Sequence, residues 1–305
     1  MLSRRILRIK AFKAVYGIAE NPGITLKEAE AELEKSCEAT RDLYLFLLAL
    51  CPSLKEEASR RIEAARSKFN PTPEEKNPNM KFVGNRIPAI LSEDPDFVKL
   101  LGKKRFSWDQ YDVFLRHLYD AVSSREWFHA YMDSQEDGLK QDADLFVKIF
   151  SEELEDSEEL ASILEDLSIW WNDDLGYALT WCCKSLQALG EGRRWNLPPL
   201  YASELPGNET LESDHAFVVG IVRNAYRHFE EYSGAVAALT PKWDRSRICT
   251  TDLALIVAGM AEAAAFPAMP VKVIINEYVE ISKFYSTPES RAFVNGLLDK
   301  LINKE

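Results

Sequence analysis

The chain has 305 residues, of which 46% are hydrophobic and 28% are charged, and it carries a formal net charge of −12. This composition is typical of a soluble globular protein, and the longest apolar runs, such as residues 43–51, are too short to span a bilayer. The five cysteines show neither CxxC spacing nor an even framework, which predicts reduced thiols and a cytoplasmic location.

The first predicted helix covers residues 1–20 and begins with a basic tip, which we define as residues 1–13. The tip contains no acidic residue, whereas the rest of the chain carries a net charge of −17. Its positive charges are Arg4, Arg5, Arg8, Lys10 and Lys13. On a helix the three arginines share one sector of the surface, so we expect their side chains to project into solvent.

An apolar stripe on the same helix is predicted to hold it against a core. It consists of Leu2, Ile6, Ile9, Phe12 and Tyr16. Guanidinium groups suit phosphate oxygens, and the ring of Tyr16 at the edge of the basic sector offers a stacking surface for an unpaired base. Single-stranded RNA is therefore one candidate partner. A solvated face without a partner and an organelle transit peptide are alternatives, and Tyr16 can equally belong to the core.

Residues 21–207 continue the helical pattern without a convincing strand. Capping boxes are predicted at Thr25 with Glu28, Ser53 with Glu56 and Ser107 with Gln110. Helix stops are predicted at Pro52 and in the segments 70–79, 190–194 and 198–210. The prediction is an all-α protein with roughly a dozen helices. Residues 21–207 hold 22 basic and 35 acidic side chains, net −13, against net −3 for residues 208–305.

Two Glu-x-x-His pairs have the spacing that di-iron carboxylate bundles use. They are Glu126 with His129 and Glu212 with His215. Both lie near predicted helix starts, where acidic and polar residues are favoured by capping and by the helix dipole. We therefore expect no metal and no cofactor. The chain also has no GxGxxG or Walker-type loop and no serine elbow, so we expect no enzyme.

The carboxyl-terminal part carries the most specific motif of the chain. Residues 270–301 read PVKVIINEYVEISKFYSTPESRAFVNGLLDKL. This run resembles the PVKV-x-INE-x-xE-x-x-K pattern and the FVNG-x-LDK ending of the NusB family of transcription antitermination factors. Residues 214–248 are similar to the family's central helix and its WD-x-x-R link, and the opening SRRILRIKAFKAVYG is similar to its arginine-rich first helix.

The resemblance covers about residues 1–20 and 208–303 and fails over most of 21–207. It therefore implies a NusB-like helical bundle, formed by the basic first helix (1–20) and the carboxyl-terminal part (208–305). The acidic helical segment 21–207 is predicted to be a large insertion between them. Such an enlarged form is similar to the NusB proteins of Bacteroidetes-type bacteria, which makes a eukaryotic transit peptide the weaker alternative.

The resemblance also implies a function and a set of contacts. NusB-family factors bind the single-stranded boxA element of nascent RNA together with the ribosomal protein NusE, within the antitermination complex of RNA polymerase, and so promote transcription of ribosomal RNA operons. The implied RNA contacts are Arg4, Arg5, Arg8, Lys10, Lys13, Tyr16, Glu289 and Phe293, and the implied NusE contact is Asp252. Ile6 stands where an arginine is common in the family, which is a departure from the pattern.

Two other functions are weighed against this one. NusB-like domains also begin certain ribosomal RNA cytosine methyltransferases, but this chain contains no cofactor-binding α/β part. A helical interaction protein that uses its acidic insertion to bind basic partners is the second alternative. Asn276 and Glu277, which are polar residues in an apolar helix, are expected to have a structural role.

Overall fold

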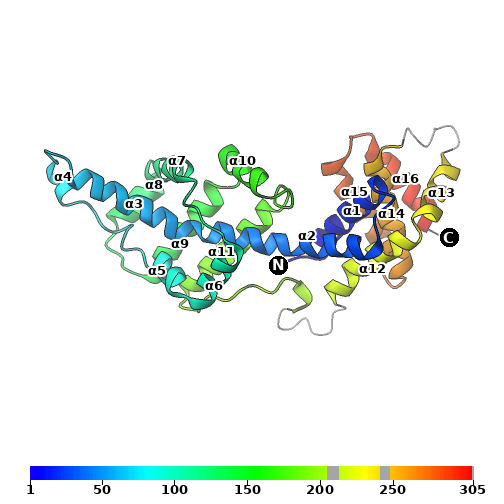
Figure 1. Cartoon of the computed structure of the whole chain (residues 1–305), viewed down its shortest axis with the longest axis horizontal. Coiled ribbons are helices and arrows are strands. Elements are labelled where there is room, and N and C mark those ends of the chain that lie inside the picture. Colours follow the sequence, from blue (N-terminus) through cyan, green and yellow to red (C-terminus); the bar gives the residue numbers. More distant parts are fainter. Residues whose placement is uncertain (205–212, 241–247, 304–305) are drawn as a thin grey trace. The chain divides into compact units, whose positions relative to one another are not determined.

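The computed structural model describes residues 1–204, 213–240 and 248–303 and shows an all-α protein (Figure 1). Within these residues no β-strand is present, and Leu2 and Tyr201 form an isolated bridge. None of the described helices is both long enough and apolar enough to cross a membrane. The predicted fold class is therefore confirmed.

The contacts divide the chain into two compact units. Unit 1 comprises residues 1–38 and 199–305, and unit 2 comprises residues 39–198. The first boundary between the units differs from the boundary that the sequence predicts after residue 20. Residues 21–38 pack with unit 1, although they belong to the predicted acidic segment 21–207. Helix α2, Leu26–Leu48, contains the first crossing between the units.

Unit 1 is built around helix α14, Thr250–Ala265, which is buried along almost its whole length. Helices α1, α12, α13, α15 and α16 pack against it. A Cβ at Gly259 would lie 2.7 Å from a methyl group of Leu298, so glycine at this position allows α16 to pack closely on α14. The remaining elements of unit 1 are α1 (Arg4–Glu20), a 3₁₀ turn (Ala202–Glu204), α12 (Asp214–Arg227), α13 (Phe229–Leu239), α15 (Val271–Tyr285) and α16 (Ser290–Ile302).

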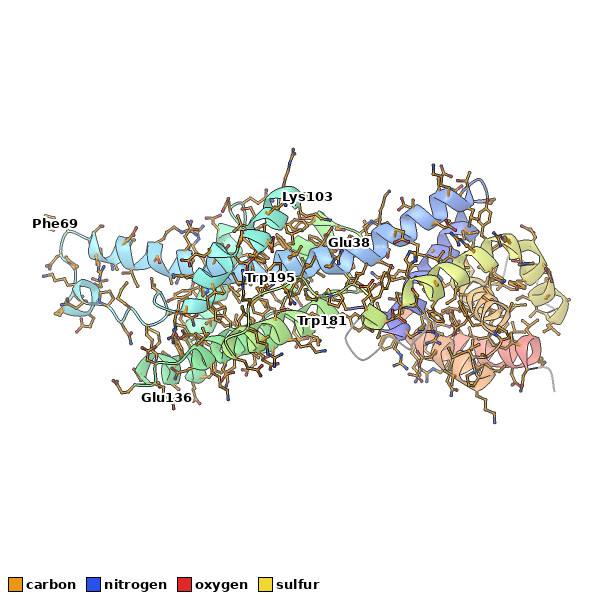
Figure 2. All side chains as sticks on the ribbon, turned by 90° about the horizontal axis from the view of Figure 1, so that it is seen from below. Glu38, Phe69, Lys103, Glu136, Trp181 and Trp195 are labelled. Atoms are coloured by element: carbon orange, nitrogen blue, oxygen red, sulfur yellow. The ribbon has the colours of Figure 1, made fainter. Side chains whose placement is uncertain are left out.

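Unit 2 has a core of aromatic rings. Phe46 stacks on Trp108 with ring centroids 4.2 Å apart and on Trp171 at 5.4 Å. The Trp108 indole donates to the carbonyl of Phe46, and the Trp195 indole donates to the Tyr44 hydroxyl. Trp195 is labelled in Figure 2. The helices of unit 2 after α2 are α3 (Leu50–Arg66), α4 (Pro73–Lys76), α5 (Arg86–Glu93), α6 (Pro95–Lys104), α7 (Asp112–Ser123), α8 (Glu126–Asp133), α9 (Leu139–Glu152), α10 (Glu158–Leu167) and α11 (Leu175–Gly190).

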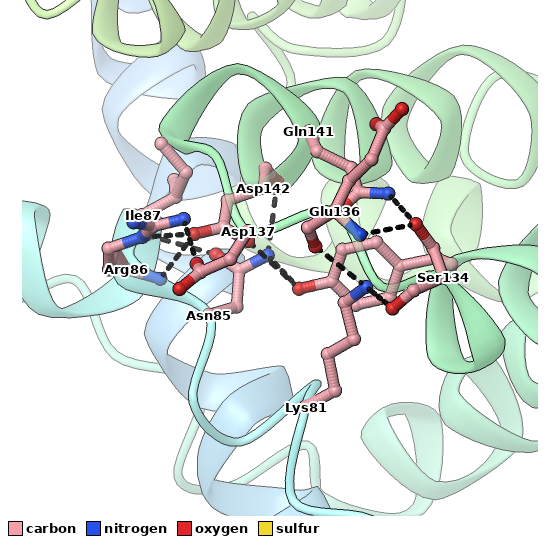
Figure 3. A network of polar contacts seen from close by, with 10 residues as sticks. Lys81, Asn85, Arg86, Ile87, Ser134, Glu136, Asp137, Gln141 and Asp142 are labelled. Carbon is pink, nitrogen blue, oxygen red and sulfur yellow. Dashed lines mark hydrogen bonds and ion pairs between the residues drawn. The ribbon is translucent and has the colours of Figure 1, made fainter.

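A buried polar network joins α5, α8 and α9 in unit 2 (Figure 3). The carboxylate of Asp142 accepts the Tyr131 hydroxyl at 3.0 Å and Nε of Arg86 at 2.6 Å. The amide of Asn85 donates to the Tyr131 hydroxyl and to the Asp142 carbonyl. Because each buried polar side chain in this group has partners, the network can specify how the three helices pack.

The predicted helix starts have mixed outcomes. The box at Thr25 is confirmed, because its hydroxyl accepts the Glu28 N–H at 3.3 Å and the Glu28 carboxylate accepts the Thr25 N–H at 2.8 Å. The box at Ser53 is wrong, since this residue lies inside α3 and donates to the Ala49 carbonyl. The box at Ser107 is also wrong, because its hydroxyl accepts the N–H of Asp109 in a turn before α7.

The stop predicted at Pro52 is displaced, because α2 ends at Leu48 and α3 begins at Leu50. Pro52 is the third residue of α3, where a backbone N–H would have no partner inside the helix. A proline there costs the helix no hydrogen bond. A capping box that sequence reasoning missed lies at Thr72 and Glu75, within the proline-rich segment 70–79 that was predicted only as a break.

Candidate nucleic-acid interface

Arg8 lies in the middle of α1, and its side chain points into unit 1. Its guanidinium donates from Nε and Nη2 to the Glu262 carboxylate of α14 at 2.9 and 2.6 Å. Arg8 is 4% exposed and Glu262 is fully buried. Burial lowers the pKa of Arg8, but the hydrogen bond and charge of Glu262 more than offset this, so the pKa is raised overall. The prediction that Arg8 projects into solvent is therefore wrong, because its partner lies 254 residues away in the sequence.

Arg4 is also paired within unit 1. Its Nε donates to the Asp214 carboxylate of α12 at 2.9 Å, and its guanidinium lies 4.2 Å from the centroid of the Phe217 ring. Asp214 is buried and accepts the N–H of Ser203 at 2.9 Å as well. These contacts hold the start of α1 on α12. Much of the Arg4 side chain is therefore engaged in packing within unit 1 and is not available at the surface.

Arg5 is the most accessible of the three arginines, with 52% of its side chain exposed. It donates from Nε and Nη2 to the Glu277 carboxylate of α15 at 3.0 and 2.7 Å. This hydrogen bond lowers the pKa of Glu277. The pair agrees with the structural role expected for Glu277. Because half of the Arg5 side chain faces solvent, its guanidinium can contact a phosphate without leaving a buried position.

The two lysines of the basic tip have different environments. Lys10 is buried, with 1% of its surface exposed, so in this conformation it is not at the surface where its predicted RNA contact would be made. Lys13 is partly exposed, and its ammonium group lies 5.6 Å from the centroid of the Tyr285 ring at the end of α15. Positive charge at the described surface of α1 therefore comes mainly from Arg5 and Lys13.

The apolar stripe of α1 is only partly buried. Leu2, Ile6 and Phe12 belong to the core, as expected, and the Phe12 ring lies 5.2 Å from that of Tyr285. Tyr16 is 39% exposed, which favours its surface alternative over its core alternative. Tyr16 is one turn beyond Phe12, the residue of α1 whose ring packs on Tyr285.

The ends of α15 and α16 carry the other predicted RNA contacts. Glu289 is exposed just before α16 begins, and Phe293 is half-buried within that helix. Phe284, which sequence reasoning missed, is 82% exposed. The signal that could have found it is the pair Phe284-Tyr285 at the helix end, because neighbouring residues on a helix point about 100° apart and a helix that packs on one side tends to expose one of two adjacent aromatic rings.

Asp252, the predicted NusE contact, is buried at the start of α14. Its two carboxylate oxygens accept the hydroxyls of Ser286 at 2.5 Å and Ser290 at 2.7 Å. The carboxylate therefore ties α14 to the turn between α15 and α16, which contains the exposed Glu289. A direct contact with a partner would need a more accessible carboxylate than this structure presents.

The two Glu-x-x-His pairs are not assembled into a metal site among the described residues. No group of three or more potential ligands occurs in this part of the chain. His129 and Glu126 are both exposed on α8, and His215 contacts Glu34 of α2 at 2.5 Å. Glu212 lies outside the described residues.

Fold and surface together define an all-α protein in which a basic first helix packs into a bundle formed by the carboxyl-terminal helices. The family model described as "NusB family" matches residues 195–303. The transcription antitermination protein NusB of Thermoanaerobacter sp. is 32% identical over 127 residues, which is 38% of this chain and 90% of the relative. The chain therefore belongs to the NusB family.

Two further relatives match over shorter stretches. NusB of Acetivibrio thermocellus is 34% identical over 91 residues, or 30% of this chain and 63% of the relative. NusB of Syntrophotalea carbinolica is 36% identical over 85 residues, or 28% of this chain and 54% of the relative. The chain thus spans less than two thirds of the length of these two proteins. No solved structure matches it.

Proposed function

We propose that the protein is a transcription antitermination factor that binds boxA-type single-stranded RNA together with NusE and promotes transcription of ribosomal RNA operons. The observation that carries this proposal is the match over 90% of a protein named transcription antitermination protein NusB. The basic and aromatic residues that α1 exposes along its length are consistent with it. Arg5 and Lys13 supply positive charge, and Tyr16 supplies a partly exposed ring.

The electrostatics favour unit 1 over unit 2 as the RNA-binding part. Unit 2 holds 20 basic and 29 acidic residues, net −9, whereas unit 1 holds 17 and 20, net −3. A net negative surface repels phosphate. One basic cluster of unit 2, residues 103–105, includes Lys104, whose ammonium group lies 2.7 Å from the Asp42 carboxylate. We therefore place the main RNA contacts on α1 and on the neighbouring ends of α15 and α16.

A matched pair of double variants tests the RNA contact. Arg5→Ala with Lys13→Ala removes two positive charges from α1, and Lys99→Ala with Lys103→Ala removes two exposed positive charges from unit 2. Fluorescence anisotropy with boxA RNA at several salt concentrations gives the slope of log K against log salt. Each lost phosphate contact flattens this slope by about 0.7. We expect a change of roughly 1.4 for the α1 variant and little change for the control.

The partner is tested by adding NusE to the same titrations. A composite surface presents more contacts than either protein alone, so RNA affinity should rise when NusE is present. Identical affinity with and without NusE would contradict the NusE part of the proposal. If neither titration shows RNA binding, the proposed function fails, and the helical interaction protein with an acidic insertion becomes the better description.

A further inference from the structure

An exposed aromatic ring at the end of α15 has no role in the packing of unit 1. Phe284 is 82% exposed, more than any other large hydrophobic residue in the described part of this unit. Its neighbour Tyr285 takes the inward position, with its ring 5.2 Å from Phe12 of α1. A buried phenylalanine stabilises a fold by removing its ring from water, and Phe284 makes little of this contribution.

The surroundings of Phe284 indicate what could cover the ring. The contact of Lys13 with the Tyr285 ring, at 5.6 Å, brings a positive charge from α1 to the residue next to Phe284. Tyr16 lies one turn further along α1 and is also partly exposed. An accessible flat ring on α15 and a cation and a second exposed ring on α1, connected through the contact of Lys13 with Tyr285, match the chemistry of a single strand, in which unpaired bases alternate with phosphates.

A protein partner fits this place less well. Protein interfaces are centred on a contiguous apolar patch that excludes water. In the described part of unit 1 the exposed large hydrophobic residues are Tyr16, Leu239, Val273 and Phe284. Val273 is eleven residues before Phe284 on α15, or about three helical turns away. Phe284 is therefore not part of a run of exposed apolar side chains along α15, and the residue next to it in the sequence, Tyr285, carries the ring that Lys13 contacts.

We propose that Phe284 stacks on an unpaired base of single-stranded RNA whose phosphates are contacted by Arg5 and Lys13. This inference rests on the proposed function and adds a residue to its binding surface. Base stacking on an aromatic side chain depends weakly on base identity, so Phe284 contributes affinity rather than sequence preference.

The test measures the affinity of the whole 305-residue chain for boxA RNA by fluorescence anisotropy, with and without NusE. Phe284→Ala should weaken binding by roughly 5- to 100-fold in both conditions, with little change in the salt slope. Phe284→Trp should restore most of the affinity, because a larger ring keeps the stacking surface. The matched control is Phe69→Ala, which removes a fully exposed phenylalanine from the loop before α4 in unit 2 and should change nothing (Figure 2).

Several outcomes would overturn the proposal. An unchanged affinity in Phe284→Ala, while Arg5→Ala with Lys13→Ala weakens binding, rejects the stacking role and leaves the proposed function intact. A loss that appears only when NusE is present assigns Phe284 to the protein partner. A Phe284→Trp variant as weak as Phe284→Ala also rejects stacking. If the unaltered protein binds no RNA, both the inference and the proposed function fail.

Discussion

The two units bury carboxylates in different ways. In unit 1, Glu262 and its partner Arg8 are both buried, with 0% and 5% of their side chains exposed. In unit 2, the buried Asp142 is paired with Arg86, whose side chain is 43% exposed. A charge whose partner is also removed from water depends mainly on that partner, whereas a partner at the surface can be replaced in part by water. The basic first helix is therefore an internal part of unit 1 as well as a surface.

Breaking the buried pair of unit 1 should have the largest effect. Glu262→Ala leaves the Arg8 guanidinium buried without its main partner, which should lower the free energy of unfolding by about 3–5 kcal/mol. Replacing both residues together, as Arg8→Met with Glu262→Leu, should recover much of this loss because no buried charge is left. Urea unfolding measures the change, and hydrogen exchange of the α14 amides assigns it to unit 1. A single variant as stable as the double variant would contradict the role of the pair.

Breaking the buried polar network of unit 2 should lower the free energy of unfolding by less than breaking the buried pair of unit 1. Asp142→Ala removes the acceptor of Tyr131 and Arg86, but Arg86 can turn to solvent (Figure 3). We expect a loss of about 2–3 kcal/mol in the free energy of unfolding, with hydrogen exchange faster in α5 and α9 and unchanged in α14. The control is Asp137→Ala, which removes the exposed second partner of Arg86 and should have little effect. Equal losses in both variants would argue against a structural role of the buried network.

Local patterns in the sequence predicted much of the fold but not the partners of the charged residues. Apolar spacing gave the helices, and the box at Thr25 marked the start of α2. The boundary between the units lies between Glu38 and Ala39 inside the same continuous helix, where no break in the pattern exists. Helical spacing predicts a surface position for Arg8. The prediction fails because nothing in the neighbouring sequence indicates that Glu262 covers this side chain.

The same limit applies to the candidate site. Sequence resemblance predicted Asp252 as a NusE contact, but its burial depends on Ser286 and Ser290, which lie more than 30 residues further along the chain.

Asp252→Ala leaves the hydroxyls of Ser286 and Ser290 without their acceptor and should lower the free energy of unfolding by about 1–3 kcal/mol. If Asp252 only positions the turn, Ser286→Ala with Ser290→Ala should produce the same change in RNA affinity. If Asp252→Ala loses NusE binding and the double serine variant does not, the predicted direct contact between Asp252 and NusE is supported instead.

The smallest expected effect concerns the ion pair that lies at the surface of unit 1. The hydrogen bond from Arg5 lowers the pKa of Glu277, so the folded state binds this proton less readily than the unfolded state. The resulting contribution to stability is present at neutral pH and is lost as the pH falls below about 4, through the lowered pKa. It should be below about 1 kcal/mol, because half of the Arg5 side chain is in water, which screens the pair.

Glu277→Gln removes the carboxylate that pairs with Arg5 and that also lies 3.8 Å from Nη1 of the buried Arg8. The melting temperature of the variant should be slightly below that of the unaltered protein at pH 7, and the difference should vanish on acidification. Glu280→Gln, on the same helix, is the control for removing a negative charge from α15. The RNA affinity of Glu277→Gln should be higher than that of the unaltered protein, because the substitution frees the Arg5 guanidinium for a phosphate. A variant with a pH-independent loss of stability and unchanged RNA affinity would show that Arg5 belongs to packing, as Arg8 does, rather than to the binding surface.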